Sequence, residues 1–360
     1  MRLIRIPRLL FPVLVIGLFF LSFAAHADAD TASTGPRPTD SFYLQRERTA
    51  PVHVRSQLTQ MRSEIQAAGH RYTVGYTTAM DRSLAELTGL KLPADLPKQV
   101  SVQFSAQNSL LRAELKRHSD FFKNHPRFKP PPPDATPPFT ASSVKADWRT
   151  ISKVTPIRDQ RYCGSCWAFA VMGAYEASYL IRNNTSLDTA EQVLVSCSTG
   201  GNCGGGWTGT ALGWLQAHGS TYEPSFPYTA SNSACHAYTA DINLAAWGYI
   251  KPDGTVASKA ELKQAIVQHG PIIVALYATD KFKAYTSGVF YEQIQAGALN
   301  HAVVLVGWDD TKNAWIMRNS WGTGWGETCG VGTERGYMYL GYGSSDVGIW
   351  SQWVQAQKLL

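Results

Sequence analysis

The feature that most constrains the fold is a stretch of small and apolar residues that begins at Cys166. Within residues 167–182 such residues recur at spacings of one, three and four, the period of an α-helix: Ala170, Val171, Ala174, Ser178 and Ile181. The stretch is apolar enough for the helix to be buried on most sides. Cys166 then lies on the first turn, where unpaired backbone N–H groups and the helix dipole favour a thiolate over a thiol.

Three motifs follow one another around and after this helix. Gln160 stands six residues before Cys166, and residues 163–167 read Cys-Gly-Ser-Cys-Trp. Leu-Asn-His-Ala-Val at residues 299–303 contains His301, and Arg-Asn-Ser-Trp-Gly at residues 318–322 contains Asn319. In order and spacing, over about residues 144–326, these motifs resemble the papain family of cysteine peptidases.

The resemblance implies a role for each of these residues. Cys166 is the nucleophile, and His301 forms a thiolate–imidazolium pair with it and later protonates the leaving amine. Asn319 orients the imidazole, and Trp321 covers the His–Asn bond from water. Gln160 joins the backbone N–H of Cys166 in an oxyanion hole.

The residues themselves support the pairing of His301 with Asn319. Residues 301–308 and 313–321 are apolar runs separated by the turn-like residues 309–312. A hairpin centred on Asp310 places His301 opposite Asn319, and a four-residue loop would shift that register by one. Opposed Cβ atoms lie roughly 4.5–5.5 Å apart, within reach of a side-chain hydrogen bond.

The resemblance also implies a substrate cleft. Gly205 and Gly206 match glycines whose backbone pairs with an extended substrate, although a plain flexible loop would read the same. An uncharged set surrounds the subsite for the residue two positions before the scissile bond: Trp207, Thr208, Ala275, Leu299 and Ala302. An apolar substrate residue is therefore expected there.

The six cysteines divide into a nucleophile and five others. The resemblance suggests disulfides between Cys163 and Cys203 and between Cys197 and Cys235. Cys329 has no counterpart in the family and lies in an insertion, residues 328–335. Arg161 also departs from the family, which usually has glycine after the glutamine.

Other interpretations of the motifs are weaker, and some stay open. A redox Cys-x-x-Cys pair would open a parallel βαβ unit, which the sequence does not contain, and Trp167 excludes a haem-attachment motif. A Cys/His acyltransferase or amidase on the same fold, and a non-catalytic secreted binding protein, remain alternatives to a peptidase.

We expect the segments before residue 142 to be cleaved off to give the mature protein. Residues 1–27 combine three arginines, an apolar stretch and Ala-His-Ala, which is typical of a signal peptide. The expected location is therefore secreted or periplasmic, or a lysosome-like compartment in a eukaryote, with no membrane anchor left after cleavage.

Residues 28–141 are expected to be a partly helical propeptide that inhibits the enzyme. Residues 28–40 read as disordered. Beyond them we expect a helix around residues 54–65, a strand at 72–76, a turn of helix at 81–87 closed by Gly89, and a short helix at 109–118. A Pro-rich linker, residues 126–139, ends the segment. The usual propeptide sequence pattern is missing, so a folding aid or a retained accessory domain is the alternative.

The remaining chain, residues 142–360, reads as one peptidase domain of the α+β class. Helices at residues 166–182, 189–196 and 208–218 precede strands at 272–277, 301–308, 314–319 and 337–342. The resemblance implies a helical lobe and an antiparallel β-barrel-like lobe with the active-site cleft between them. We expect peptide or protein substrates, no cofactor and no metal. The net charge of +6 comes from the segments before residue 142, so nucleic acid is not an expected partner.

Overall fold

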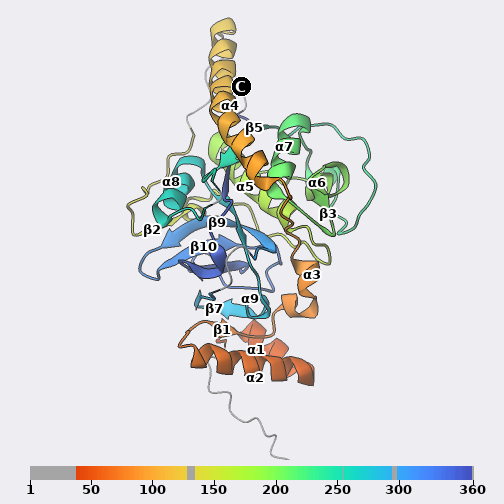
Figure 1. Cartoon of the computed structure of the whole chain (residues 1–360), viewed down its shortest axis with the longest axis vertical. Coiled ribbons are helices and arrows are strands. Elements are labelled where there is room, and N and C mark those ends of the chain that lie inside the picture. The colour runs from red at the N-terminus through yellow and green to blue at the C-terminus, as the bar shows by residue number, and fades with distance from the viewer. Residues whose placement is uncertain (1–37, 128–133, 254, 294–297, 359–360) are drawn as a thin grey trace, which may run out of the picture. The chain divides into compact units, whose positions relative to one another are not determined.

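The computed structural model describes residues 38–127, 134–253, 255–293 and 298–358 (Figure 1). The predicted signal peptide, most of the predicted disordered stretch and residues 128–133 of the linker lie outside these ranges. Within them, no helix is both long enough and apolar enough to cross a membrane.

Helix α5 (Cys166–Asn183) lies at the centre of the fold, as its composition predicts. Every residue from Cys166 to Arg182 is buried, and the helix packs against strands of the sheet and against another helix. Its one buried acid is hydrogen-bonded: Glu176 accepts from the backbone N–H of Thr189 at 2.9 Å. Burial of a continuous apolar surface on all sides fixes the position of Cys166 at its first turn.

The helical lobe surrounds α5 with short elements. These are α6 (Glu191–Cys197), α7 (Thr208–His218) and the two-stranded hairpin of β3 (Gly201–Asn202) and β4 (Gly205–Gly206). The disulfide between Cys197 and Cys235 ties α6 to the loop that leads out of this lobe.

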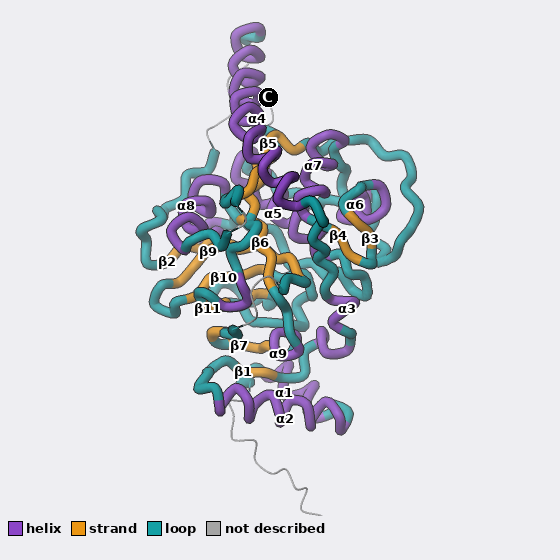
Figure 2. The backbone as a smooth tube through the Cα atoms, viewed as in Figure 1, coloured by secondary structure: helices purple, strands orange, loops and turns teal. Residues whose placement is uncertain are grey.

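The second lobe is a sheet of eight strands (Figure 2). In chain order they are β2 (Lys145–Asp147), β5 (Leu244–Tyr249), β6 (Ile272–Leu276), β8 (Val289–Phe290), β9 (His301–Asp309), β10 (Ala314–Arg318), β11 (Tyr337–Gly341) and β12 (Gln352–Ala356). The main path runs β5-β12-β6-β9-β10-β11-β8, and β2 pairs with β9. Strands β6, β9, β10 and β11 are buried throughout, which explains why they read as apolar runs.

The α+β, two-lobe prediction is confirmed, with one difference in the sheet. Within this sheet every described strand pairing is antiparallel except that of β11 with β8, and along the described strands the path stays open between β5 and β8 rather than closing into a barrel. Shorter elements connect the strands: η2 (Trp148–Ile151), η3 (Glu223–Ser225), α8 (Lys259–His269), α9 (Asp280–Lys283), β7 (Tyr285–Ser287) and η4 (Ser344–Asp346).

Residues 38–127, called the N-terminal segment from here on, fold against this domain. Their first elements are α1 (Ser41–Arg48), α2 (Val52–Ala67), β1 (Thr73–Val74), η1 (Thr78–Asp81) and α3 (Leu84–Leu87). Strand β1 pairs with β7 of the sheet lobe. Helix α3 begins with a capping box formed by Ser83 and Glu86, within residues 81–87 where the sequence predicts a turn of helix.

Helix α4 (Leu96–Asn124) is far longer than the short helix expected at residues 109–118. It lies along the edge strand β5, where the Gln103 side chain donates to the backbone oxygen of Trp247 at 2.9 Å, and Glu114 pairs with Arg182 of α5 at 3.4 Å. It also buries Leu96 and Val100 in the apolar core, whereas Val102 and Leu115 are exposed, so its apolar residues do not mark one buried face from end to end.

Candidate active site

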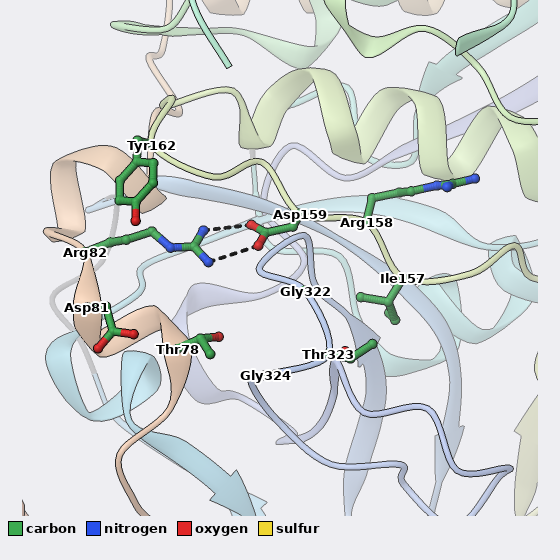
Figure 3. A pocket seen from close by; sticks show the side chains of 10 residues that line it. All are labelled: Thr78, Asp81, Arg82, Ile157, Arg158, Asp159, Tyr162, Gly322, Thr323 and Gly324. Atoms are coloured by element: carbon green, nitrogen blue, oxygen red, sulfur yellow. Dashed lines mark hydrogen bonds and ion pairs between the residues drawn. The ribbon is translucent and has the colours of Figure 1, made fainter. Parts of the chain in front are cut away.

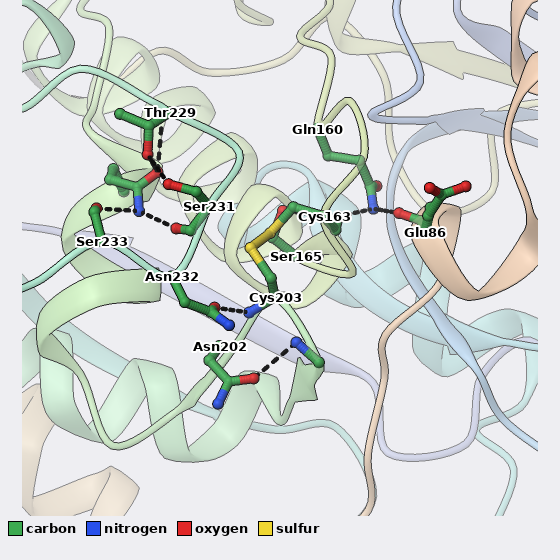
Figure 4. Close-up of a disulfide and its surroundings, with 12 residues drawn as sticks. Glu86, Gln160, Cys163, Ser165, Asn202, Cys203, Thr229, Ser231, Asn232 and Ser233 are labelled. Atoms are coloured by element: carbon green, nitrogen blue, oxygen red, sulfur yellow. Dashed lines mark hydrogen bonds between the residues drawn. A yellow bond between two sulfur atoms is a disulfide. The ribbon is translucent and has the colours of Figure 1, made fainter.

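Cys166 is the first residue of α5. Three residues before it, Cys163 forms a disulfide with Cys203 (Figure 4). Gly164 between the two cysteines has no room for a side chain. A Cβ there would lie 2.7 Å from the backbone oxygen of Thr88 and 2.8 Å from that of Cys203. The loop before Cys166 is thus packed against the helical lobe on one side and the N-terminal segment on the other.

His301 opens strand β9 and is hydrogen-bonded to Asn319 beyond the end of β10. Its Nε2 lies 2.8 Å from Asn319 Oδ1. An amide oxygen only accepts, so Nε2 carries the proton and Nδ1 is the basic nitrogen. Nδ1 is buried without a hydrogen-bond partner in the described part of the chain. The Trp321 ring lies 4.8 Å from the imidazole ring, and all three side chains are buried.

The hairpin register that predicts the contact between His301 and Asn319 is wrong, although the contact exists. Ala314 pairs with Asp309, so the loop has four residues, and a further shift occurs between Ile316 and Met317. The ladder ends at Arg318, and His301 lies opposite Leu276 of β6 instead. The hydrogen bond therefore joins side chains at two strand ends, not an opposed pair.

Cys166 and His301 belong to one site. The backbone N–H of Ala302, directly after His301, faces the Cys166 sulfur, as does the N–H of Trp167 in the first turn of α5. The helical lobe thus supplies the thiol and the sheet lobe supplies the imidazole.

Gln160 is fully buried and held at both ends of its amide. Its Oε1 accepts from Ser320 Oγ at 2.8 Å. Its Nε2 donates to the Cys163 oxygen at 2.9 Å and to the Leu87 oxygen at 3.1 Å. Leu87 belongs to the N-terminal segment, and its oxygen also accepts from the Trp321 indole N–H at 3.0 Å. The Leu87 carbonyl oxygen therefore accepts hydrogen bonds from both the Gln160 amide and the Trp321 indole.

The N-terminal segment continues past Cys166 to the glycines of β4. The Gly206 N–H donates to the Gly89 oxygen and the Lys91 N–H donates to the Gly206 oxygen, both at 2.8 Å. Gly89 and Leu90 also donate to the Asn300 oxygen at 2.9 Å each. The pairing of Leu90 with Gly206 is parallel. Residues 87–91 thus occupy the site as an extended strand held by backbone hydrogen bonds.

Several of the residues predicted to line the substrate cleft belong to the same apolar cluster as Leu90. Leu90 is buried in the apolar cluster that contains Trp207, Ala275 and Ala302, with Leu299 packed against the cluster. Gly205 leaves room for the backbone, because a Cβ there would lie 2.6 Å from the Gly89 oxygen.

Sequence reasoning missed the segment that fills the site. It interprets Gly89 only as the end of a helical turn. In the structure a Cβ on Gly89 would lie 1.9 Å from the Gly164 oxygen, so glycine is required by close backbone approach. Nothing local to residues 87–91 signals this contact, because its partner lies 75 residues away in the sequence (from 89 to 164).

Burial governs the charge state of the two reactive side chains. Burial raises the pKa of the Cys166 thiol to about 12, although nearby N–H groups oppose the rise. Burial lowers the pKa of His301 to about 4, against the effect of its bond to Asn319. The full chain therefore favours a neutral thiol and a neutral imidazole. Burial under the N-terminal segment thus works against the predicted thiolate–imidazolium pair, because both of its charged forms lose hydration.

Comparison with known proteins agrees with this geometry. Residues 142–356 match the model of the family described as papain family cysteine protease. Digestive cysteine proteinase 3 of Homarus americanus is 37% identical over 223 residues, which are 55% of this chain and 68% of that protein. Human cathepsin O is 33% identical over 218 residues, 59% of this chain and 65% of its own length.

The chain belongs to the papain family of cysteine proteases.

Solved structures of the family extend the likeness to the N-terminal segment. Digestive procathepsin L 3 of Tenebrio molitor superposes with a TM-score of 0.61 at 23% identity over 89% of this chain and 94% of that one. The 89% exceeds what residues 142–360 provide, so the shared fold includes part of the N-terminal segment. Bromelain from Ananas comosus has a TM-score of 0.53 at 28% identity, over 59% of this chain and 99% of its own.

Two departures from the papain-family pattern are visible in the structure. Arg161, where the family usually has glycine, has a left-handed backbone with φ of 53°, a conformation that glycine adopts without strain. Cys329 in the insertion is a buried free cysteine whose pKa burial also raises. Among the described residues, no group of three or more His, Cys, Asp or Glu is placed to hold a metal ion.

The pKa shifts predict how the two free cysteines react. In the full chain at pH 6, iodoacetamide should label Cys166 and Cys329 equally slowly. A pKa of about 12 makes the Cys166 thiolate roughly a thousandfold rarer than that of a free cysteine near 8.5. Once the N-terminal segment is removed, Cys166 should react far faster than Cys329. Mass spectrometry of labelled peptides measures both rates, and rapid labelling of Cys166 in the uncleaved chain would contradict the shift.

Proposed function

We propose that this papain-family protease is a secreted endopeptidase made as a zymogen, with the N-terminal segment as its inhibitory propeptide. One observation carries the proposal. The backbone of residues 87–91 crosses a site made of Cys166, His301 with Asn319, and Gln160, and forms hydrogen bonds there of the kind that a peptide substrate would form.

The catalytic roles follow from the chemistry of the four side chains. After the segment leaves, water enters, the Cys166 proton moves to His301 Nδ1, and the thiolate–imidazolium pair forms. The sulfur attacks the peptide carbonyl carbon. His301 then donates its proton to the leaving amine, and a thioester remains on Cys166. Water deprotonated by His301 attacks the thioester, which releases the acid and restores the thiol.

Gln160 and Asn319 act on this cycle without forming covalent bonds. Gln160 Nε2 donates to the oxyanion together with the Cys166 N–H, a contribution of about 2.7–4 kcal/mol for one donor. In the zymogen the Leu87 oxygen takes up one of its hydrogen bonds. Asn319 holds the imidazole so that Nδ1 stays the basic nitrogen.

Secretion rests on the sequence and on the cysteines. Residues 1–27 have the composition of a signal peptide, and the chain carries two disulfides, which persist in oxidising compartments. The proposed domains are the signal peptide, residues 1–27, the propeptide, residues 28–141, and the peptidase domain, residues 142–360.

The first test concerns latency. Substituting Gly89→Val should expel the strand from the cleft, because a Cβ at this position would overlap the Gly164 oxygen. The uncleaved variant should then hydrolyse a fluorogenic peptide and label at Cys166, while the wild-type precursor stays latent until it loses about residues 28–141. Intact-mass analysis at each time point checks that the chain is uncleaved.

Gly69→Ala is the matched control for that test. Gly69 lies in the same segment with a φ of +70°, and a Cβ added to it would have no neighbour within 4 Å, so alanine there strains the backbone without entering the cleft. It should leave the precursor latent. A wild-type precursor that is fully active before cleavage would refute the zymogen proposal. Hydrolysis that persists in Cys166→Ala would refute the proposed nucleophile, and failure to cleave any peptide would favour an acyltransferase, an amidase or a binding protein.

The second test concerns the residue two positions before the scissile bond. Leu90 is buried against the uncharged cleft wall, so Leu, Val and Phe should all be accepted there. One methylene in such a pocket changes binding by about 1–3 kcal/mol, so these three should differ modestly. Arg and Asp should be poor, because a charge would be buried without a partner. Values of kcat/KM for peptides that vary only at this position decide the point, and a clear preference for Arg or Asp would show that the pocket is misplaced.

A further inference from the structure

A pocket of about 500 Å³ lies between the N-terminal segment and the peptidase domain, close to Gln160 (Figure 3). The N-terminal segment lines it with Thr78, Asp81 and Arg82, and the peptidase domain lines it in part with Asp159 and Tyr162. Arg82 reaches across the pocket and contacts Asp159 with both terminal guanidinium nitrogens, Nη1 to Oδ1 at 2.7 Å and Nη2 to Oδ2 at 3.0 Å.

The peptidase domain contacts the Arg82 guanidinium with two further groups. The Arg161 backbone oxygen accepts from Nη1 at 3.1 Å, and the guanidinium carbon lies 5.6 Å from the centre of the Tyr162 ring. Asp159 is itself held, because its Oδ1 accepts the Arg161 N–H at 2.8 Å. Gly322 leaves space for the carboxylate, since a Cβ there would lie 3.0 Å from Oδ2. Bidentate carboxylate, carbonyl and aromatic ring together form a site suited to a guanidinium, which we call the guanidinium site.

Removal of the N-terminal segment would leave Asp159 without its ion-pair partner. The two arginines next to Asp159 in the sequence, Arg158 and Arg161, do not take the place of Arg82 as its ion-pair partner. Arg158 pairs with Asp188 at 2.7 Å. The Arg161 side chain does not line the pocket, and its charge acts instead on Glu223 and Tyr228, where it opposes the rise in pKa caused by burial.

The course of the N-terminal segment indicates on which side of Cys166 this site lies. Leu90 pairs with Gly206. The Leu87 oxygen accepts from Gln160 and Trp321. Arg82 forms an ion pair with Asp159. Asp159 thus lies beyond Gln160 on the side away from Gly206. If the acyl part of a substrate lies along Gly206, the part that leaves as the amine lies along Gln160 and toward Asp159.

The position of the matching substrate residue follows from the length of α3. The four residues Leu84–Leu87 form a turn of helix, which advances about 6 Å, whereas an extended peptide advances about 3.3 Å per residue. With Ser83 included, the distance from Leu87 to Arg82 corresponds to two or three residues of an extended substrate.

We propose that Asp159 is a specificity-determining residue, and that the guanidinium site binds an arginine of the substrate two or three positions after the scissile bond. Arg82 is then the zymogen's internal occupant of a substrate site. The inference rests on the proposed endopeptidase function. Lysine should bind less well, because it cannot form the bidentate contact or stack on Tyr162 as a planar group.

The test uses enzyme obtained by activating the full-length precursor. Internally quenched peptides keep Leu two positions before the scissile bond and carry Arg, Lys, citrulline or Glu at the second or the third position after it. Mass spectrometry confirms the cleaved bond. At one of the two positions, kcat/KM for Arg should exceed that for citrulline by roughly 3- to 10-fold, the range for a partly exposed charge pair. The ratio of kcat/KM for Arg to that for citrulline should fall as salt is added. The value for Lys should lie between those for Arg and citrulline.

Variants assign the preference to Asp159. Asp159→Asn should bring the ratio of Arg to citrulline to about 1, and Asp159→Glu should keep a preference for Arg. Asp310→Asn is the matched control, because Asp310 also pairs with a cation, Lys263 at 2.6 Å, its side chain is 31% exposed against 38% for Asp159, and it does not line the pocket. It should leave the ratio unchanged.

The outcomes separate this inference from the proposed function. Equal kcat/KM for Arg and citrulline at both positions, or a preference that survives Asp159→Asn, would overturn the guanidinium site while peptide hydrolysis stands. If no peptide is cleaved, the endopeptidase function fails and the inference fails with it.

Discussion

Exclusion of water from Cys166 and His301 determines the state of the whole chain. Both side chains are fully buried, and the contact that closes the site is the approach of the Gly89 backbone to Gly164. Side by side and in contact with water, the two groups can stabilise each other as an ion pair, whereas burial penalises both charged forms. The buried helix α5, the open sheet and the N-terminal segment meet at Cys166 and His301. The same cleft that would stabilise an ion pair when open therefore keeps the pair neutral when closed.

This neutralisation has a consequence for activation. Besides the proton on His301 Nε2, the pair holds one further proton, on the Cys166 sulfur in the closed chain and on His301 Nδ1 in the proposed open state. The number of bound protons does not change, so through this pair acid neither favours nor opposes opening. Any effect of pH on activation must come from other groups, such as Glu327, whose pKa burial raises, with the Tyr285 hydroxyl bond and the Gly288 N–H opposing the rise. Opening then depends on loss of the backbone and ion-pair contacts along residues 82–91.

Much of the peptidase domain could be predicted because its signals are local or ordered along the chain. The buried α5 follows from apolar spacing, and the site residues follow from three motifs in sequence order. The hairpin register could not be predicted, because a four-residue loop and a bulge shift it without changing the apolar pattern. The length of helix α4 was underestimated, because its apolar residues include the exposed Val102 and Leu115 beside the buried Leu96 and Val100. The passage of residues 87–91 through the site was missed, because backbone hydrogen bonds leave no mark on side-chain composition.

The central claim is that the N-terminal segment, through burial, holds the catalytic pair in its neutral form. A titration of His301 by NMR of histidine-labelled protein tests it most directly, with the signal assigned by its loss in His301→Ala. The account predicts a pKa of about 4 in the full-length chain, and a value above the ordinary 6.5 after the segment is removed and a thiolate partner forms. A His301 pKa that is the same in both forms would contradict it.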